Sequence, residues 1–272
     1  NIALISGIAW DHINVFPTYD NYVEQFEIFI DKITNGGILV YNEDDAEVKR
    51  VSEAATNPIR KLPYSTPAYS VSDGVTLLET PEGPMPIEVF GAHNLNNLAG
   101  AKWICQNMGV DEADFYEAIA SFKGASKRLE KIAEGKGRVA YKDFAHSPSK
   151  VAATTKAVKE QYPKRTLVAC LELHTYSSLN AEFLKEYEGA LEYADEAVVF
   201  YSPDAVKIKQ LEEVTYEQIA KAFNRVDLII YTNPTEFKQY LFNRNLENSA
   251  LLLMSSGNYG GLNFDEVKQL IE

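Results

Sequence analysis

Short apolar runs recur through the second half of the chain, and their spacing constrains the fold more than any other feature. Stretches with helical spacing of apolar residues separate five such runs, at 139–142, 167–171, 197–201, 228–231 and 251–254. Strands that alternate with helices form a mostly parallel sheet covered by helices on both faces. Ligands of such sheets gather at the carboxyl ends of the strands. We therefore expect an α/β fold with its functional site at that edge.

The first half begins with the same alternation. Apolar periodicity predicts, in order, a strand, a helix, a strand and a helix at 2–6, 22–33, 38–41 and 44–54. Residues 59–88 alternate short β-type runs with Pro, Gly and Ser turns, which predicts a small antiparallel section. Two helices should follow, at 94–108 and 111–122, with Asp111 as a helix-capping residue.

Small and basic residues at 123–128 interrupt this pattern before the second β/α alternation begins. The sequence therefore predicts two domains, 1–126 and 127–272. Because the first residue is not Met and a buried strand opens the chain, we expect an upstream part of the first domain to be missing.

The charge balance argues against some classes of partner. With 39 acidic and 26 basic side chains, the formal net charge is −13, which disfavours broad contact with nucleic acid. A nucleotide can still bind where backbone amides, a few cations and Mg²⁺ supply positive charge. No apolar stretch approaches the roughly 20 residues of a membrane-spanning helix, and no charged-then-apolar leader opens the chain. We expect no membrane insertion and a cytoplasmic location; the oligomeric state stays open.

All 4 histidines lie beside a predicted strand end or helix start. His12 follows Asp11 after the first strand, His146 and His174 follow two strands of the second half, and His93 precedes the helix at 94–108. Such placement favours a role in ligand binding or catalysis over isolated structural histidines. Asp11 or His12 can hold Mg²⁺, directly or through water, when phosphates complete its shell. The alternative is that Asp11 only caps the following turn.

Asn94 and Asn97 lie one helical turn apart on the same face of the predicted helix. Two amides placed in this way can read the edge of a purine. The alternative is that Asn94 is the N-cap. For Asp143, Ser147 and Pro148, capping of a strand end and a helix start is likewise the alternative to chemistry.

Four segments, in this order, resemble the Mur ligase family, which also includes folylpolyglutamate synthases. They are an Asp-His segment at a strand end (8–14), Gly-Ala-His-Asn-Leu-Asn-Asn (91–97), a Lys-Gly segment ending in Arg128 (122–128) and Asp-Phe-Ala-His-Ser-Pro (143–148). The resemblance implies the C-terminal part of a central ATPase domain, 1–126, followed by a Rossmann-like C-terminal ligase domain, 127–272. Residues 254–262 look most like the murein peptide ligases, with the UDP-N-acetylmuramate alanine ligases as the nearest branch.

The resemblance also implies a reaction. ATP and Mg²⁺ would be the cofactors, and an amino acid or peptide would be joined to UDP-N-acetylmuramate through an acyl phosphate, in peptidoglycan synthesis or recycling. By this resemblance His12 helps to hold Mg²⁺, and Asn94, Asn97, Arg128 and Asp143 approach the nucleotide.

In the second domain, Arg128 and His146 are the expected catalytic residues. Phe144, His146, His174 and Tyr176 are expected to contact the substrates. His146 or His174 would orient the amine or receive its proton.

Two departures from the family pattern matter. The Gly-rich phosphate loop with its Lys, and the acidic magnesium ligand, would lie upstream of Asn1, so we expect this chain alone to be inactive. Residues 171–178 contain no arginine for an incoming carboxylate, which leaves the identity of the amine open. Two other readings stay open: a non-catalytic homologue that binds a nucleotide or muropeptide, and a folylpolyglutamate-type ligase.

Overall fold

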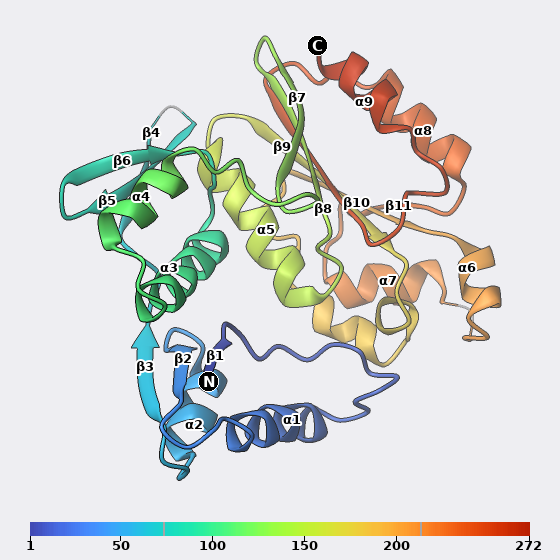
Figure 1. Ribbon diagram of the computed structural model, residues 1–272. Helices are drawn as coiled ribbons and strands as arrows, with labels where there is room; N and C mark the ends of the chain where they lie inside the picture. Colours follow the sequence, from blue (N-terminus) through green and yellow to red (C-terminus); the bar gives the residue numbers. More distant parts are fainter. Residues whose placement is uncertain (73, 213) are drawn as a thin grey trace. The chain divides into compact units, whose positions relative to one another are not determined.

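The computed structural model describes residues 1–72, 74–212 and 214–272. The chain forms two compact α/β units, Asn1–Lys123 and Gly124–Glu272, each with its own apolar core (Figure 1). In the part of the chain that is described, no helix is both long enough and apolar enough to cross a membrane.

The first unit is built on a parallel sheet of three described strands in the order β1 (Ile2–Ile5), β2 (Ile38–Asn42) and β3 (Arg60–Tyr64). The helices α1 (Tyr19–Asp31) and α2 (Ala46–Ala54) pack against one face through an apolar cluster that includes Ile30, Leu39 and Val48. Helix α1 begins a turn before its predicted start, because the side chain of Thr18 accepts a hydrogen bond from the amide of Asn21 at 3.2 Å and caps the helix.

The prediction of one antiparallel section over 59–88 is wrong in its first part. Strand β3 pairs with β2 in parallel, and only β4 (Tyr69–Ser72), β5 (Val75–Thr80) and β6 (Gly83–Ile87) pair with one another in antiparallel fashion. Alternating apolar residues mark a strand in either orientation, so the pattern could not tell the two apart. Pro63 fits because β3 lies at the edge of its sheet, where a missing N–H is tolerated.

Helix α3 (Ala92–Asn107) joins the two sheets of the first unit. Ala99 and Trp103 pack against the parallel sheet, whereas Leu95 and Leu98 pack against the antiparallel sheet and against α4 (Glu112–Ala120). Asp111 occupies the N-cap position of α4 with an extended backbone, although its carboxylate makes no capping hydrogen bond within the described residues.

In the described part of the second unit, six strands form one sheet in the order β11-β10-β9-β12-β8-β7. All neighbouring strands are parallel except β7 and β8. The strands are β7 (Glu130–Gly135), β8 (Arg138–Asp143), β9 (Thr166–Leu173), β10 (Glu196–Tyr201), β11 (Ile229–Tyr231) and β12 (Ser249–Met254). The predicted α/β class with a mostly parallel, Rossmann-like sheet is confirmed.

Helices cover both faces of this sheet, and its core lies between them (Figure 1). α8 (Pro234–Asn243) and α9 (Phe264–Ile271) pack on one face, through buried residues that include Phe237 and Val267. On the other side, α5 (Pro148–Gln161) contacts β9 and β12, and α7 (Tyr216–Phe223) packs beside the 3-10 helix η2 (Phe183–Tyr187). Helix α6 (Pro203–Ile208) follows β10.

Two local expectations for the second unit are wrong. Strand β7 was absent from the prediction, because its sequence, Glu-Lys-Ile-Ala-Glu-Gly, is largely polar and pairs only at the edge of the sheet. The stretch after β9 forms the 3-10 helices η1 (Ser177–Leu179) and η2 instead of a regular α-helix.

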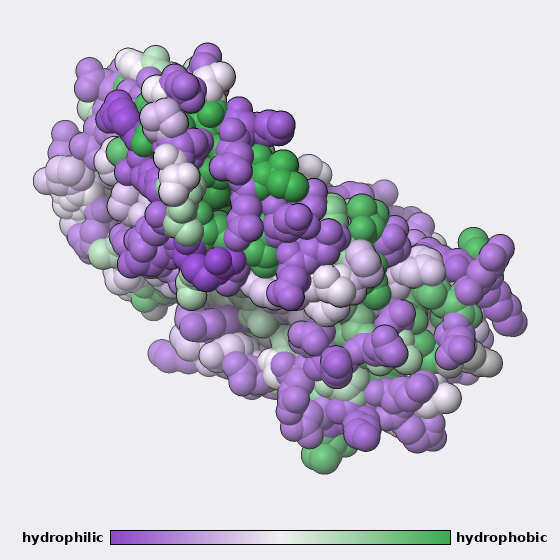
Figure 2. Space-filling view, turned by 90° about the horizontal axis from the view of Figure 1, so that it is seen from below, coloured by the Kyte–Doolittle hydropathy of each residue, from purple (hydrophilic) through white to green (hydrophobic). Residues whose placement is uncertain are grey.

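Hydrophilic residues predominate on the face shown in Figure 2, with apolar residues scattered among them. The large apolar side chains that are most exposed, among them Val15, Met108 and Ile208, come from separate parts of the chain. Single exposed apolar residues of this kind are ordinary on a protein surface.

Candidate active site

The carboxyl ends of three neighbouring strands of the second unit lie side by side. In the register of the sheet, Met254 at the end of β12 stands between Asp143 of β8 and Leu171 of β9. The last residues of these strands and the segments that follow them carry the polar clusters at 143–148, 172–178 and 255–259. The fold therefore brings together at one edge three clusters that are far apart in the sequence.

The side chain of Asp143 links the turn at 127–129 to the end of β8. Its buried carboxylate accepts hydrogen bonds from the amide of Leu129 at 2.7 Å and from the amide of Ala145 at 2.6 Å. The amide of Phe144 donates to the carbonyl of Lys127 at 2.9 Å. Lys127 and Leu129 have left-handed backbones, with φ of 56° and 45°. Such conformations cost about 1–3 kcal/mol each outside glycine, so these hydrogen bonds hold a strained turn in place.

Arg128 lies between these two left-handed residues and is exposed. Its guanidinium carbon is 5.6 Å from the centre of the Phe144 ring, and the ammonium of Lys127 is 5.9 Å from the same centre. Cations at this distance from an aromatic face are attracted by its electron density. Phe144 therefore holds two positive charges beside the end of β8, where an anionic group such as a phosphate can be bound.

His146 is held in one orientation. Its side chain is 7% exposed, and its Nδ1 lies 2.8 Å from the carbonyl oxygen of Phe144. Because a carbonyl oxygen only accepts, Nδ1 is the donor in this hydrogen bond. The ring meets Phe144 edge-on at a centroid distance of 5.2 Å, and the hydroxyl of Tyr187 donates to the His146 carbonyl.

Glu172 is a residue at this edge that sequence reasoning did not assign to the site. It is 2% exposed near the end of β9, and its Oε2 accepts hydrogen bonds from the Ser255 hydroxyl and, at 2.8 Å, from the Tyr259 amide. Its Oε1 lies 3.7 Å from Nδ1 of His174. The available signal was an acidic residue at the end of an otherwise apolar strand, but its partners on the β12 loop could not be read from the sequence.

The side chain of Tyr259 holds the loop after β12 in place. Its hydroxyl lies 2.7 Å from the carbonyl oxygen of Cys170 and 2.8 Å from that of Met254, and it donates to them. Complete burial raises the pKa of Tyr259 well above its usual value, so the hydroxyl keeps the proton that these contacts need. Its ring also stacks on Phe237 at a centroid distance of 5.0 Å.

His174 and Tyr176, both predicted to contact substrate, are accessible. Each side chain is 41% exposed. The loop that carries them is fixed by reciprocal hydrogen bonds, in which the amide of Thr175 donates to the hydroxyl of Ser178 at 2.9 Å and the amide of Ser178 donates to the hydroxyl of Thr175 at 3.1 Å. The second unit thus gathers Arg128, Asp143, Phe144, His146, His174 and Tyr176, and places them around the carboxyl edge of one sheet.

The remaining predicted residues, His12, Asn94 and Asn97, belong to the first unit. The side chain of His12 is 65% exposed, and its amide donates to the carboxylate of buried Asp11 at 2.7 Å. Among the described residues, no group of three His, Cys, Asp or Glu side chains is arranged to hold a metal. His12 can supply one of the roughly six ligands that Mg²⁺ takes.

The alternative that Asn94 is an N-cap is wrong, because α3 begins earlier. Gly91 takes the N-cap position with a φ of 87°, a conformation that favours glycine. Asn94 lies in the first turn and donates from Nδ2 to the carbonyl of Phe90 at 3.0 Å, while Asn97 is exposed on the same face. The intervening Asn96 is buried and donates to Oδ1 of Asn42 at 3.0 Å, so it is a structural residue.

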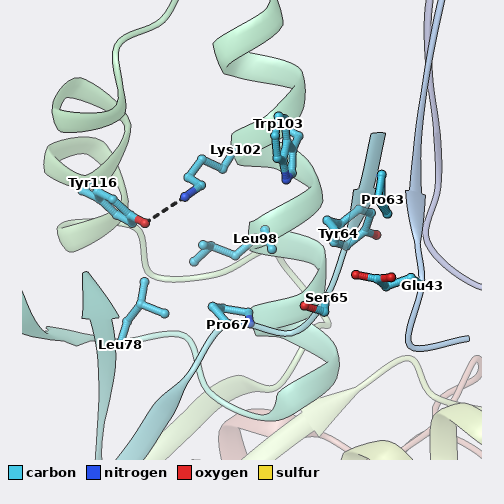
Figure 3. A pocket seen from close by; sticks show the side chains of 11 residues that line it. Glu43, Pro63, Tyr64, Ser65, Pro67, Leu78, Leu98, Lys102, Trp103 and Tyr116 are labelled. Carbon is cyan, nitrogen blue, oxygen red and sulfur yellow. Dashed lines mark hydrogen bonds between the residues drawn. The ribbon is translucent and has the colours of Figure 1, made fainter. Parts of the chain in front are cut away.

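A pocket of about 290 Å³ opens beside α3 in the first unit (Figure 3). It is lined by Lys102, Trp103 and Tyr116 among others, and it includes none of the predicted site residues. The ammonium of Lys102 already donates to Glu112 at 2.8 Å and to the hydroxyl of Tyr116 at 3.1 Å, the latter drawn as a dashed line. Lys102 is therefore already paired with side chains of the first unit.

The sequence matches two models of one protein family. Residues 1–105 match the Mur ligase middle domain, and residues 127–257 match the Mur ligase glutamate ligase domain. A UDP-N-acetylmuramate–L-alanine ligase of Caldicellulosiruptor bescii is 30% identical over 210 residues, which are 73% of this chain and 46% of that protein. A ligase of the same name from Alkaliphilus metalliredigens is 25% identical over 280 residues, covering 94% of this chain and 58% of that protein. The chain thus spans about half the length of the relatives that it matches.

Solved structures show the same fold. A UDP-N-acetylmuramate–alanine ligase of Thermotoga maritima superposes with a TM-score of 0.66 at 16% identity, covering 100% of this chain and 58% of the other. A murein peptide ligase of Psychrobacter arcticus gives 0.63 at 17% identity, covering 100% and 57%. A MurF ligase of Thermotoga maritima in complex with ADP gives 0.68 at 18% identity, covering 99% and 60%.

Proposed function

Because the chain belongs to the Mur ligase family, we propose that it is part of an ATP-dependent ligase that joins an amino acid or peptide to UDP-N-acetylmuramate. The relatives named for UDP-N-acetylmuramate and L-alanine support this choice of acid substrate, and the murein peptide ligase supports a place in peptidoglycan synthesis or recycling. We place the reaction in the cytoplasm, which supplies ATP.

The observation that best supports the proposal is at the strand-end edge of the second unit. This edge combines the exposed cation of Arg128 with two imidazoles, those of buried His146 and exposed His174. In the first chemical step, a carboxylate oxygen of the acid substrate attacks the γ-phosphorus of ATP, and ADP leaves. Negative charge gathers on the phosphoryl oxygens in this transition state. Arg128, held by the turn that Asp143 fastens and by the face of Phe144, is placed to offset that charge.

In the second step, the amine nitrogen attacks the acyl carbon, and the tetrahedral intermediate expels phosphate. The amine must lose a proton to give a neutral amide. Imidazole groups suit such a transfer because they change protonation near neutrality. His146 and His174 both lie at this edge; the first is buried and fixed, and the second is open to solvent.

In the first unit, we assign Asn94 and Asn97 to the nucleotide base. Their amides lie on one face of α3 and can pair with a purine edge. His12 is proposed as one ligand of Mg²⁺, with nucleotide phosphates supplying others, and this metal would neutralise phosphate charge. The MurF ligase solved with ADP supports nucleotide binding by this fold.

The loop after β9 bears on the identity of the amine substrate. Residues 171–178 contain no arginine, so an α-carboxylate has no bidentate partner in the loop after β9. This observation favours a peptide, whose backbone offers hydrogen-bonding groups in addition to its terminal charges. The missing arginine also fits the alternative function, that of a homologue that binds these ligands without catalysis.

The test is ADP release by the full-length protein with ATP, Mg²⁺ and UDP-N-acetylmuramate, comparing L-alanine with muropeptide di-, tri- and tetrapeptides. Peptide-dependent release supports a peptide ligase, and release with alanine alone supports an amino-acid ligase. Arg128→Gln should lower kcat by about 100-fold, since a single charged donor to a transferring phosphoryl group is commonly worth that much. Lys136→Gln, in the β7–β8 turn, is the matched control. No release with any amine would favour the non-catalytic rival.

A further inference from the structure

Glu172 is a charged side chain in a place where charge is costly. It lies near the end of a strand whose other residues from Leu167 onwards are buried and mostly apolar, and it is itself 2% exposed. An isolated carboxylate buried to this extent is strongly unfavourable unless hydrogen bonds satisfy it. The groups around its two oxygens therefore indicate what it does.

The loop after β12 fixes one oxygen. Oε2 accepts from the Tyr259 amide at 2.8 Å and from the Ser255 hydroxyl. The Ser255 oxygen in turn accepts from the amide of Gly257 at 2.7 Å, which leaves its own hydrogen directed at Glu172. Because backbone amides cannot reverse their polarity, the group at the Oε2 position must be an acceptor.

The other oxygen faces His174. Oε1 lies 3.7 Å from Nδ1 of the imidazole, a separation too long for a hydrogen bond, so the interaction in this structure is electrostatic. A negative oxygen attracts a protonated Nδ1 and repels an Nδ1 lone pair. In the neutral ring, a proton on Nδ1 makes Nε2 the acceptor, on the side of the ring away from Glu172.

The backbone at Gly257 lies close to both Glu172 and His174. A Cβ added there would lie 2.8 Å from Oε2 of Glu172, closer than real contacts allow, and 3.0 Å from Cγ of His174, which is a tight contact. The backbone of the loop thus shields the carboxylate and one side of the imidazole, although the His174 side chain as a whole stays 41% exposed. Shielding from water strengthens the electrostatic effect of the carboxylate.

We propose that Glu172 is a positioning residue that keeps His174 protonated on Nδ1, so that Nε2 accepts the proton that the amine loses. The nitrogen–carbon bond forms, the proton passes from the amine nitrogen to Nε2, and the phosphate leaves with the electron pair of its bond to carbon. The identity of the proton donor rests on the proposed function; the tautomer of His174 does not. His146, with Nδ1 bound to the Phe144 carbonyl and little exposure, is left to orient the substrate.

The substitution Glu172→Gln gives a sharp test because the loop dictates how the amide must turn. The amide oxygen has to occupy the Oε2 position to accept from Tyr259, which places the amide NH₂ opposite Nδ1 of His174. A donor in that position repels an N–H on Nδ1 and attracts an Nδ1 lone pair, so the neutral ring should switch to the tautomer protonated on Nε2. That tautomer cannot take a proton at Nε2.

The experiment is ¹H–¹⁵N NMR of the 272-residue chain labelled at histidine, at about pH 9, where an ordinary imidazole is neutral. Substitution of His174 by Asn identifies its signals among those of the 4 histidines. We expect the Nδ1–H tautomer in the wild type and the Nε2–H tautomer in Glu172→Gln. Ser255→Ala, which disturbs the same loop but keeps the carboxylate, should retain Nδ1–H, as should Glu186→Gln at an exposed position.

An Nε2–H tautomer in the wild type would overturn the proposal without any variant, even if Glu172→Gln failed to fold. A switch in Ser255→Ala as complete as in Glu172→Gln would also overturn it, because loop damage and not the carboxylate would then set the tautomer. In the full-length protein, Glu172→Gln should lower kcat by about 100-fold with the KM for ATP unchanged. An inverted tautomer with normal kcat would refute the proton-transfer role. Absence of ligation by the wild type would refute the proposed function and leave the tautomer result standing.

Discussion

At the scale of single residues, two buried carboxylates organise the candidate site, and both do so through backbone amides. Asp143 holds the turn that presents Arg128, and Glu172 holds the loop after β12. The sequence predicted Asp143 as a nucleotide contact because it stands in a family motif. In the structure both of its oxygens accept from the chain itself, at Leu129 and Ala145, so its first role is to shape the site.

Replacing Asp143 with Asn should destabilise the second unit. Both partners of the carboxylate are fixed amide donors, so in either orientation the new NH₂ group faces one of them. One hydrogen bond is lost and two donors oppose each other, which should cost about 2 kcal/mol. Urea unfolding followed by circular dichroism measures the loss, with Glu186→Gln as the exposed control. Unchanged stability would show that the turn at 127–129 does not depend on Asp143.

Glu196 lies at the amino end of β10, and we expect its ion pair to make the free energy of unfolding depend on pH. Hydrogen bonds from Arg244 and Tyr240 lower the pKa of the Glu196 carboxyl, although burial acts in the other direction. The ordinary glutamate pKa is about 4.3, so the stabilisation is complete above that value and is lost as pH falls through the lowered pKa.

We therefore expect Glu196→Gln to lower stability at neutral pH by about 2 kcal/mol and to lose less than the wild type on acidification to about pH 3.5. The remaining slope should come from other carboxyls, including Asp195, whose pKa is lowered by Lys159 and the Leu167 amide despite its burial. Denaturant unfolding at both pH values measures this difference. Parallel pH curves for the two proteins would rule out the Glu196 contribution.

At the scale of elements, sequence patterns predicted most strands and helices but not all of their pairings. Four of the five apolar runs of the second half became the strands β8, β9, β10 and β12, because runs buried on both faces are mostly apolar. The fifth became β11, which is half-buried at the edge of the sheet. Strand β7, polar and at an edge, gave no such signal, and β3 gave one that did not specify its direction. Strand ends could thus be located, and with them Asp143, His146 and His174.

The insertion of β12 between β8 and β9 could not be read from any local pattern. This strand order brings the loop at 255–259 into contact with Glu172, so the sequence patterns could not predict that contact. The same applies to the left-handed turn around Arg128, since nothing in Lys127 or Leu129 favours positive φ.

The glycine at the N-terminus of α3 gives a testable prediction about this helix. Gly91 caps the helix with a φ of 87° and a ψ of 136°, a conformation that costs a residue with a Cβ about 1–3 kcal/mol. Gly91→Ala should lower the free energy of unfolding of the first unit by this amount and weaken nucleotide binding by the full-length protein, because Asn94 lies in the first helical turn. Thermal unfolding and ADP titration measure the two effects. Ala101→Ser, on an exposed part of the same helix, is the control, and full retention of both properties by Gly91→Ala would contradict this account.

At the scale of the whole molecule, each unit supplies a different part of the proposed reaction. The first offers the asparagines assigned to the nucleotide, and the second offers Arg128 and the two histidines assigned to the phosphoryl and amine steps. The two units correspond to the two regions that match the family's middle-domain and glutamate-ligase-domain models, 1–105 and 127–257. In the proposed reaction, the full-length protein activates a carboxylate as an acyl phosphate before the amine attacks.

Transfer of a carboxylate oxygen to phosphate is the direct test of the acyl phosphate. The full-length protein is supplied with ATP, Mg²⁺, an acceptor peptide and UDP-N-acetylmuramate labelled with ¹⁸O in its carboxylate, and the released phosphate is examined by mass spectrometry or ³¹P NMR. An acyl phosphate carries a carboxylate oxygen to phosphorus, so we predict one ¹⁸O atom in each phosphate released by ligation. Release of unlabelled phosphate during ligation would contradict the account.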